Sequence, residues 1–311
     1  MSDFSGERER LRALIPAMEA RDRLYQAVRA FFVADGYTEV HTPIRVATPA
    51  MELHIDAFGS GGAWLRTSPE LHMKRLVAAG METVFQLGAC FREGERGERH
   101  HPEYTMLEWY DVRLSPGAMI DQVAELLRAG TEAVSGKRIV TYRGRTVDLA
   151  NPVEIVPVQD VFLAQAGWDP LAEFCADRFD TDLVERVEPW LAERPGMVAL
   201  VDFPAPLAAL ARIDAQRPQV AERWELYVAG VELCNAYGEL TDAEEQRVRF
   251  EEWGKERAAA GRAVYPLDEA FLAALEDGFP TCSGAALGVD RWLMLALSEE
   301  GFDTVLPFRD G

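Results

Sequence analysis

The sequence has no apolar run long enough to cross a membrane. Its longest apolar stretches fall far short of the 18 or more residues that a bilayer-spanning helix needs. The stretch Met1–Arg12 alternates acidic and basic residues and has no apolar signal region. These absences predict a cytoplasmic protein without a membrane partner.

Cysteine is also scarce, with four residues in 311 and no paired spacing between them (Cys90, Cys175, Cys234 and Cys282). A disulfide framework or a zinc site needs cysteines at short, paired intervals. The sequence therefore predicts reduced thiols and no metal cage.

Positively charged residues are outnumbered: the chain has 32 lysines and arginines and 52 aspartates and glutamates, which gives a net charge of −20. Proteins that bind a polyanion usually present a basic face, from which counterions are released. Nucleic acid is therefore a poor default partner, and we expect no tRNA binding. A local exception is Arg92–Arg99, which holds three arginines.

What is present is a large apolar core. With 48% apolar and 27% charged residues, the chain is expected to fold as a single globular domain over residues 1–311. Apolar residues at helical spacing predict a helix over Leu11–Phe32, stopped near Gly36, and Thr38–Pro43 reads as a short extended segment. Ser68-Pro69-Glu70 predicts the start of another helix.

Alternating apolar residues then predict a strand near Val84–Arg92 and a second one over Tyr104–Tyr110, paired antiparallel across a long charged loop. Residues from about 115 to 220 are rich in proline, and we interpret them as an insertion with supporting helices. Strand patterning returns over Trp224–Ala236. The segment Thr241–Glu244 reads as a capping box that opens a helix, and Gly284–Leu297 as a strand running into a helix.

Two residues of the second strand carry candidate chemistry. Glu108 and Tyr110 emerge on the same face because side chains alternate along a strand, and Arg92 can lie on that face of the neighbouring strand. A carboxylate beside a phenol can bind an ammonium group. The alternative is an ordinary solvated strand face.

The charged loop between the strands, Phe91–Tyr104, combines glycines that permit tight turns with arginines that can clamp phosphate oxygens. It suits a triphosphate, or else it is only a solvent-facing hairpin loop. Glu232 and Glu239 could hold Mg²⁺ between phosphates, because this ion prefers a few carboxylates with phosphate oxygens and water. A spacing of seven would put them on opposite faces of a regular strand, so a shared site requires a bend near Gly238.

Other candidates have equally good structural explanations. Glu70 can be a first-turn acid that complements the helix dipole. Gly284 and Gly288 can be packing glycines, although an arginine after such a turn, here Arg291, can stack on a base and reach a phosphate.

Taken together, these segments resemble the three signature motifs of class II aminoacyl-tRNA synthetases of the lysine type. The third motif corresponds to Gly284–Arg291, the second to Phe91–Tyr110, and the first more loosely to Gly36–Pro43. Thr67–Leu76 and Gly230–Asp242 resemble the amino-acid and metal segments. The resemblance implies an α+β fold, a class II catalytic core with an antiparallel sheet flanked by helices, and a homodimer.

Within this family the chain is most similar to the lysyl-tRNA synthetase paralogues that attach β-lysine to elongation factor P. Only about 35 residues precede the first motif, so we expect no anticodon-binding domain. Ser68 stands where the synthetases have alanine, a change associated with accepting β-lysine. The ending Thr105–Tyr110 has the paralogues' form. The resemblance implies a ligase that uses ATP and Mg²⁺ to activate lysine or (R)-β-lysine and transfers it to a lysine of elongation factor P.

The resemblance also implies roles for single residues. Arg92 and Arg291 would be catalytic, Arg92 at the ATP α-phosphate and Arg291 at adenine and the γ-phosphate. The ATP site would comprise Arg92, Glu93, Gly94, His101, Glu232, Leu233, Gly288 and Arg291. Mg²⁺ would be held by Glu232 and Glu239. The amino acid would be bound by Ser68, Pro69, Glu70, Glu108, Tyr110, Asn235 and Glu239, with Glu70 at the amine nearest the carboxylate and Glu108 and Tyr110 at the distal ammonium.

Two departures from the synthetase pattern bear on the ATP site. Phe91-Arg92 is followed by Glu93-Gly94, so the adenine-side glutamate is missing or replaced by Glu93 or Glu95. His101 stands where the family has asparagine. The alternatives are a minimal lysyl-tRNA synthetase, an ammonia-using asparagine synthetase of the same fold, and a non-catalytic regulatory paralogue, which would be expected to lose Arg92, Glu232 or Arg291.

Overall fold

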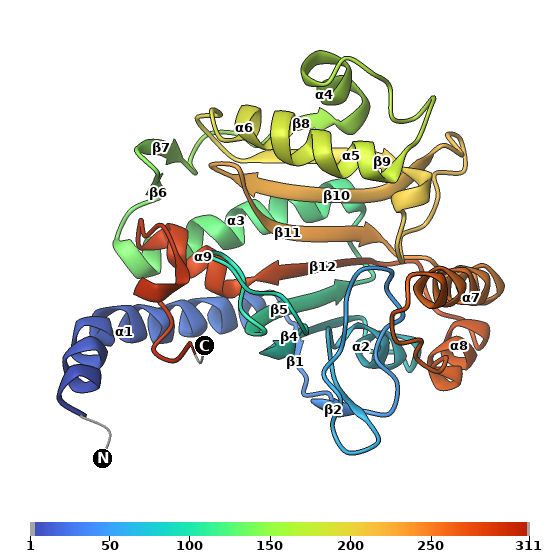
Figure 1. The fold of residues 1–311 in the computed structure, drawn as a ribbon, viewed down its shortest axis with the longest axis horizontal. Coiled ribbons are helices and arrows are strands. Elements are labelled where there is room, and N and C mark those ends of the chain that lie inside the picture. Colours follow the sequence, from blue (N-terminus) through green and yellow to red (C-terminus); the bar gives the residue numbers. More distant parts are fainter. Residues whose placement is uncertain (1–3, 310–311) are drawn as a thin grey trace.

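The computed structural model describes residues 4–309, and its centre is one eight-stranded sheet (Figure 1). The strand order is β1-β4-β5-β12-β11-β10-β9-β8. Pairing is antiparallel except at the two outer pairs, β1 with β4 and β8 with β9, so the predicted α+β fold is confirmed with a mixed sheet. The strands are β1 (Thr38–Glu39), β4 (Thr83–Phe91), β5 (Glu103–Asp111), β8 (Glu154–Pro157), β9 (Val198–Pro204), β10 (Val220–Val228), β11 (Val231–Gly238) and β12 (Ser283–Gly288).

Three helices cover one face of this sheet: α1 (Phe4–Ala34), α3 (Pro116–Ser135) and α9 (Val289–Ala296). Phe85 and Trp109, from neighbouring strands, are fully buried against Phe32 of α1. Because strand side chains alternate, the intervening residues of β4 and β5 point to the opposite face. The predicted strand pair and the predicted N-terminal helix are confirmed.

The opposite face is covered at one end by α2 (Glu70–Ala78), α7 (Ala243–Ala259) and α8 (Glu269–Glu276). The predicted helix start at Ser68-Pro69-Glu70 is confirmed, and the Ser68 hydroxyl accepts a hydrogen bond from the Glu70 backbone N–H at 2.9 Å. The cap of α7 is Asp242, whose carboxylate accepts from the Glu245 N–H, and not Thr241 as predicted.

Residues 115–220, interpreted from the sequence as an insertion with supporting helices, contribute more than helices to the fold. This segment supplies β8 and β9 to the main sheet, and α3 to its core face. Strand β9 is almost wholly apolar and therefore lacks the alternation by which a half-buried strand is recognised. The segment also contains β6 (Ile139–Tyr142), β7 (Arg145–Asp148), α4 (Val158–Gln165), α5 (Ala176–Asp182), η1 (Leu183–Val187), α6 (Glu188–Leu191) and η2 (Ala205–Leu207).

The predicted strand over Trp224–Ala236 is two strands joined by a tight hairpin. Ala229 and Gly230 form the turn with φ angles of 52° and 74°, the left-handed geometry that two-residue hairpin loops favour. Leu226 pairs with Cys234 and Tyr227 with Glu232, so Leu233 is an extra residue that bulges from β11. This bulge decides which side chains of β11 face the site.

The remaining elements are β2 (Arg45–Val46), β3 (Trp64–Leu65) and η3 (Phe302–Thr304). All four cysteines are free thiols, as predicted. Within residues 4–309, none of the helices is long and apolar enough to cross a membrane.

Candidate active site

The open face of the sheet carries two joined cavities. The larger, of about 320 Å³, will be called the large lobe, and the smaller, of about 60 Å³, the small lobe. They share six lining residues, which form the seam between the lobes: Glu52, Arg92, Met106, Asn235, Tyr237 and Ala286. Residues from β5, β10, β11 and β12, with Arg92 directly after β4, therefore converge on one site, as the sequence predicted for Arg92 and Glu108.

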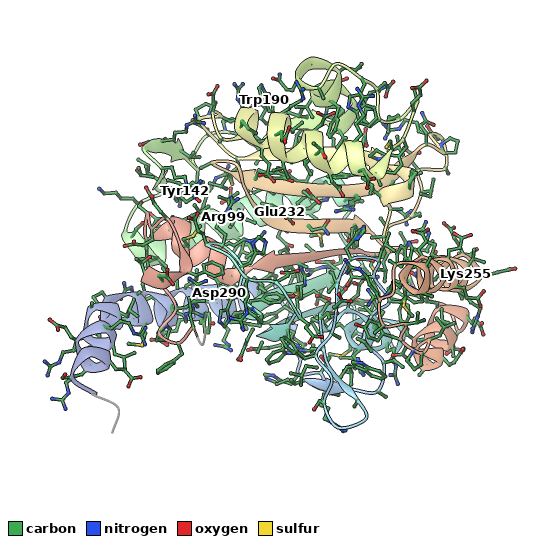
Figure 2. The ribbon with its side chains drawn as sticks, viewed as in Figure 1. Arg99, Tyr142, Trp190, Glu232, Lys255 and Asp290 are labelled. Carbon is green, nitrogen blue, oxygen red and sulfur yellow. The ribbon has the colours of Figure 1, made fainter. Side chains whose placement is uncertain are left out.

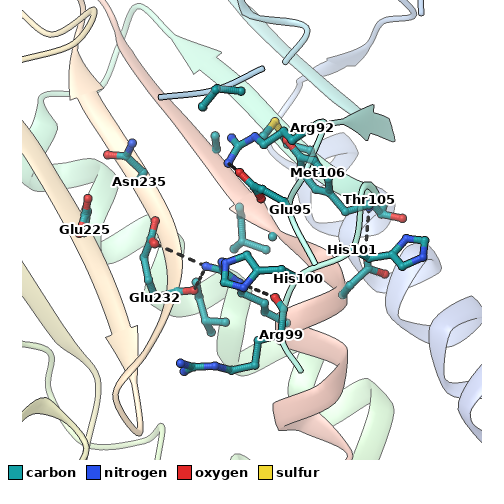
Figure 3. Close-up of a pocket in the computed structure, with 18 of the residues that line it drawn as sticks. Arg92, Glu95, Arg99, His100, His101, Thr105, Met106, Glu225, Glu232 and Asn235 are labelled. Atoms are coloured by element: carbon teal, nitrogen blue, oxygen red, sulfur yellow. Dashed lines mark hydrogen bonds and ion pairs between the residues drawn. The ribbon is translucent and has the colours of Figure 1, made fainter. Parts of the chain in front are cut away.

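Arg291 lies at the base of the large lobe, at the start of α9. Its guanidinium donates to the backbone carbonyl of Glu232 at 3.1 Å and lies 3.4 Å from that residue's carboxylate. It also lies 2.6 Å from Nε2 of His100, a residue labelled in Figure 3. Burial, together with the positive charge of Arg291, lowers the pKa of His100, so the neutral ring can accept this hydrogen bond. Gly288 precedes the helix and lines the same lobe.

Arg92 stands at the seam, where its guanidinium lies 5.2 Å from the centre of the Tyr104 ring. Its ion pair with Glu95 is long, at 3.5 Å. The buried Nε atom of Arg92 has no hydrogen-bond partner among the described residues. A buried guanidinium N–H without an acceptor fits an anionic ligand oxygen at this point.

Two of the carboxylates that line the large lobe come from neighbouring strands, Glu232 from β11 (Figure 2) and Glu225 from β10; Figure 3 labels both. Glu225 is buried and is held by Arg223 at 2.5 Å and by the Tyr227 hydroxyl at 2.6 Å. Burial raises the pKa of Glu225, although Arg223 opposes the shift. Two carboxylates that line a cavity together with Arg92 are the kind of oxygen donors that Mg²⁺ takes alongside phosphate.

The structure separates the two residues of the predicted metal pair, Glu232 and Glu239. The bulge at Leu233, and not a bend near Gly238, brings both residues to the same face. They nevertheless lie at opposite ends of β11, roughly 20 Å apart at the rise of an extended strand. Glu239 does not line the large lobe, and its carboxylate is 2.6 Å from Lys74. Glu225 takes the place beside Glu232.

The small lobe is built around the Glu108 carboxylate. The Ser68 hydroxyl donates to one of its oxygens at 2.7 Å and the Tyr110 hydroxyl to the other at 2.8 Å. Glu108 is only 2% exposed, and burial raises its pKa to about 8. Gly284 forms the wall of this lobe, where a Cβ atom would lie 2.4 Å from the Tyr110 ring. The lobe can thus hold an ammonium group against an oriented carboxylate.

A buried lysine lies behind the small lobe. Lys74 Nζ is 2.5 Å from Glu70 and 2.6 Å from Glu239, and Lys74 and Glu239 are each 1% exposed. Lys74 therefore occupies one oxygen of Glu70, which the sequence had assigned to a substrate amine. This cation follows Glu70 by four residues on α2, but nothing in the sequence relates it to Glu239.

Most of the other predicted residues line the site, and three do not. Leu233 lines the large lobe, and Asn235 lines both lobes. Glu93 and Gly94 line neither lobe, because Glu93 is tied by its backbone N–H to Asp56 and Gly94 turns the chain at a φ of 83°. Their role at ATP stays a prediction, whereas Glu95 does line the large lobe. Pro69 caps α2 and lines neither lobe.

His101 lines the large lobe, but its ring nitrogen Nδ1 is taken by the Glu103 backbone at 2.6 Å. Its neighbour His100 makes the contact with Arg291. Four residues at or behind the site were not predicted from the sequence: His100, Glu225, Lys74 and Glu52. The only available signal was the spacing of Glu225 and Tyr227, which repeats that of Glu108 and Tyr110.

Comparison with known proteins places this site in a family. Residues 9–310 match the family model described as tRNA synthetases class II (D, K and N). An elongation factor P–(R)-β-lysine ligase of Avibacterium paragallinarum is 37% identical over 95% of this chain and 96% of its own length. Ligases of the same name from Proteus mirabilis and Klebsiella pneumoniae are 37% and 40% identical, each over 95% of both chains. The chain belongs to the class II tRNA synthetase family that serves aspartate, lysine and asparagine.

Proposed function

We propose that this protein is an ATP-dependent ligase that activates (R)-β-lysine or α-lysine and transfers it to a lysine side chain of elongation factor P. The names of its relatives support the acceptor and the β-lysine substrate. The observation that carries the proposal is the small lobe. Its buried Glu108, oriented by Ser68 and Tyr110, suits the distal ammonium of a lysine-type substrate and opens directly onto the large lobe.

The first step joins the two substrates at the seam. An oxygen of the amino-acid carboxylate attacks the α-phosphorus of ATP, the bond to the bridging oxygen breaks, and pyrophosphate leaves. Arg92 lines both lobes, so its guanidinium can contact the α-phosphate as charge develops there. Such chemistry depends on positioning and electrostatics and needs no protein nucleophile.

In the second step the neutral amine of the acceptor lysine attacks the acyl carbon of the adenylate. The carbon–oxygen bond to AMP breaks, the nitrogen loses a proton, and an amide forms. The acceptor must reach the acyl carbon at the seam, where the residues shared by the two lobes lie.

Arg291, Gly288, Leu233 and Glu232 would form the rest of the ATP site, with His100 fixing Arg291. Glu225 and Glu232 would hold Mg²⁺, which neutralises phosphate charge when bound. The unpaired Arg92 Nε and this pair of carboxylates are the features that fit an ATP–Mg²⁺ ligand.

Pyrophosphate exchange tests the substrate. We expect exchange with (R)-β-lysine and α-lysine and none with aspartate, because Glu108 would repel a second carboxylate. Exchange with aspartate alone would favour an asparagine synthetase of the same fold, and no exchange with any of the three would favour a regulatory paralogue.

Transfer from the adenylate tests the acceptor. Radiolabelled lysine or β-lysine should appear on elongation factor P and not on tRNA. Efficient charging of tRNA would refute the proposal in favour of a minimal lysyl-tRNA synthetase.

The homodimer expected from the family belongs to the same proposal. Sedimentation equilibrium should give twice the mass of the chain, 34.7 kDa; a monomer at micromolar concentration would contradict it.

A further inference from the structure

A third cavity adjoins the large lobe and will be called the arginine groove. Its volume is about 320 Å³. Arg99 lines both cavities and is the one described residue that they share; Figure 2 labels it together with Tyr142, which also lines the groove. The charged residues of the groove are Arg99, Arg143, Arg145 and Glu188. In a chain with a net charge of −20, three arginines around one cavity are a local excess of positive charge.

The arginine groove lies at the end of the large lobe that is away from the seam. Asn235 and Tyr237 of β11 belong to the seam, whereas Ala229 and Gly230, in the turn before β11, line the groove. On an extended strand, Asn235 and Gly230 are separated by roughly 15 Å. Glu232 lies between them and lines the large lobe. The order along β11 is therefore seam, Glu232 and arginine groove.

Two polar side chains of the groove have no partner. The Arg99 guanidinium makes no hydrogen bond or ion pair with any other residue between 4 and 309, and only its backbone carbonyl is used, by Arg291. The buried Tyr142 hydroxyl has no hydrogen-bond partner among the described residues. Burial raises the pKa of Glu188, while the charge of Arg99 acts in the opposite direction. Unpaired donors beside a surplus of positive charge favour an anionic ligand.

Arg143 and Arg145 are exposed residues of the β6–β7 hairpin. Each is paired with a glutamate that does not line the groove, Arg143 with Glu98 at 2.6 Å and Arg145 with Glu193 at 3.4 Å. Exposed ion pairs contribute little stability, so a multiply charged anion can displace the glutamates. Arg143 also has a φ of 48° in a turn whose geometry favours Asn, Asp or Gly. The hairpin thus carries an arginine where its backbone favours other residues.

The reaction proposed above releases an anion toward this end of the large lobe. The amino-acid carboxylate approaches the α-phosphorus from the small lobe, and in an in-line displacement the leaving group departs on the opposite side. Pyrophosphate therefore departs from the seam in the direction of Glu232 and the arginine groove. Its charge and its oxygen atoms suit guanidinium groups, which bind phosphates through two parallel hydrogen bonds.

We propose that the arginine groove is an exit site for pyrophosphate, which binds there after it has left the α-phosphorus. The inference rests on the proposed function and adds an anion site outside the cavity that would hold the triphosphate of ATP. Arg99 contacts the anion in both cavities, and Arg143 and Arg145 hold it in the groove.

Pyrophosphate exchange with α-lysine tests the site through one kinetic constant. The double variant Arg143→Gln/Arg145→Gln should raise the KM of pyrophosphate about ten-fold or more, as expected for the loss of charged contacts. It should leave the KM of ATP and the KM of lysine unchanged, because neither arginine lines either lobe. Arg99 is left intact because it also lines the large lobe.

The matched control is Arg138→Gln/Lys255→Gln, which removes the same number of positive charges. Arg138 is paired with Glu132 and is 47% exposed, as Arg145 is, but it does not line the groove. This variant should leave all three KM values unchanged. The inference is overturned if the KM of pyrophosphate does not change in Arg143→Gln/Arg145→Gln, or if it rises equally in the control.

Isothermal titration separates the groove from the triphosphate site. The protein is first saturated with α,β-methylene-ATP, whose P–C–P bridge cannot release pyrophosphate, and is then titrated with pyrophosphate. The wild type should bind pyrophosphate under these conditions, and Arg143→Gln/Arg145→Gln should bind it about ten-fold more weakly. Absence of binding to the saturated wild type would show that no separate site exists and would overturn the inference.

The transfer step provides the remaining comparison. A higher KM of elongation factor P in Arg143→Gln/Arg145→Gln, with an unchanged KM of pyrophosphate, would assign the groove to acidic side chains of the acceptor and refute the exit site. Failure of the proposed function would look different. The wild type would then show no exchange with either lysine, while titration with pyrophosphate alone would still report on the groove.

Discussion

Replacing Lys74 by methionine should destabilise the protein in a way that depends on pH. Methionine keeps an unbranched side chain of similar length but leaves Glu70 and Glu239 without their shared cation, which lies 2.5 Å and 2.6 Å from them. Removing one partner of a buried ion pair typically costs about 3–5 kcal/mol, because the remaining charge stays buried. The side chain of Glu239 is 1% exposed, so water cannot replace the lysine.

The loss of folding free energy is limited, because the Glu239 carboxylate can take up a proton when Lys74 is absent. Burial already raises the pKa of Glu239 to about 7 with Lys74 present, and losing the lysine raises it further. Neutralising a carboxyl group of ordinary pKa, about 4.3, costs ~4 kcal/mol at pH 7 and ~1 kcal/mol at pH 5. A folded-state pKa above the unfolded value lowers stability as pH rises. Lys74→Met should therefore be less harmful at pH 5 than at pH 7.

Reversible urea unfolding, followed by tryptophan fluorescence at both pH values, measures this effect. Lys255→Met, an exposed lysine on α7, is the matched control and should stay within about 0.5 kcal/mol of the wild type. Adding Glu239→Gln to Lys74→Met should recover part of the loss, because it removes the unpaired acid. An equal loss at both pH values, or a double variant as unstable as the sum of the single changes, would refute the reasoning.

Three further predictions concern the site itself. Arg92→Ala should abolish pyrophosphate exchange while the circular dichroism spectrum stays that of the wild type; retained exchange would mean that the phosphate site lies elsewhere. Glu225→Gln should raise the Mg²⁺ concentration for half-maximal exchange about ten-fold, whereas Glu239→Gln should leave it unchanged, and the opposite pattern would restore the original metal pair. Gly284→Ala would place a Cβ atom 2.1 Å from a Glu239 oxygen. We therefore expect a higher KM for lysine and an unchanged KM for ATP. An unchanged KM for lysine would show that the side chains around Gly284 can move to accommodate the added methyl group.

The parts of the site that were predictable are those whose geometry follows from neighbours in the chain. Glu108 and Tyr110 had to share a face because they are two residues apart on a strand, and the structure joins them by a hydrogen bond of 2.8 Å. The start of α2 at Glu70 follows from the serine and proline before it. Arg92 and Glu108 come from adjacent strands and line the same small lobe, although the register sets Gln86 opposite Glu108.

The position of Glu232 relative to other carboxylates could not be predicted from strand alternation. Counting residues from Glu232 assumes a regular strand, but the register against β10 leaves Leu233 unpaired and reverses the alternation after it. The turn at Ala229-Gly230 then sets Glu225 beside Glu232, on the neighbouring strand. A bulge depends on how two strands align over their whole length, so a local pattern does not reveal it.

The sequence by itself determined the family, the strand pair with Arg92, Glu108 and Tyr110, and the glycine-marked strand that leads to Arg291. These features rest on short-range periodicity and on motifs, both of which can be recognised in the sequence alone. Only the tertiary structure decided that Lys74 neutralises Glu70 and Glu239, and that Arg99, Arg143 and Arg145 line one groove. The charge state of a buried group depends on which distant segments exclude water from it, and that is a property of the packed chain.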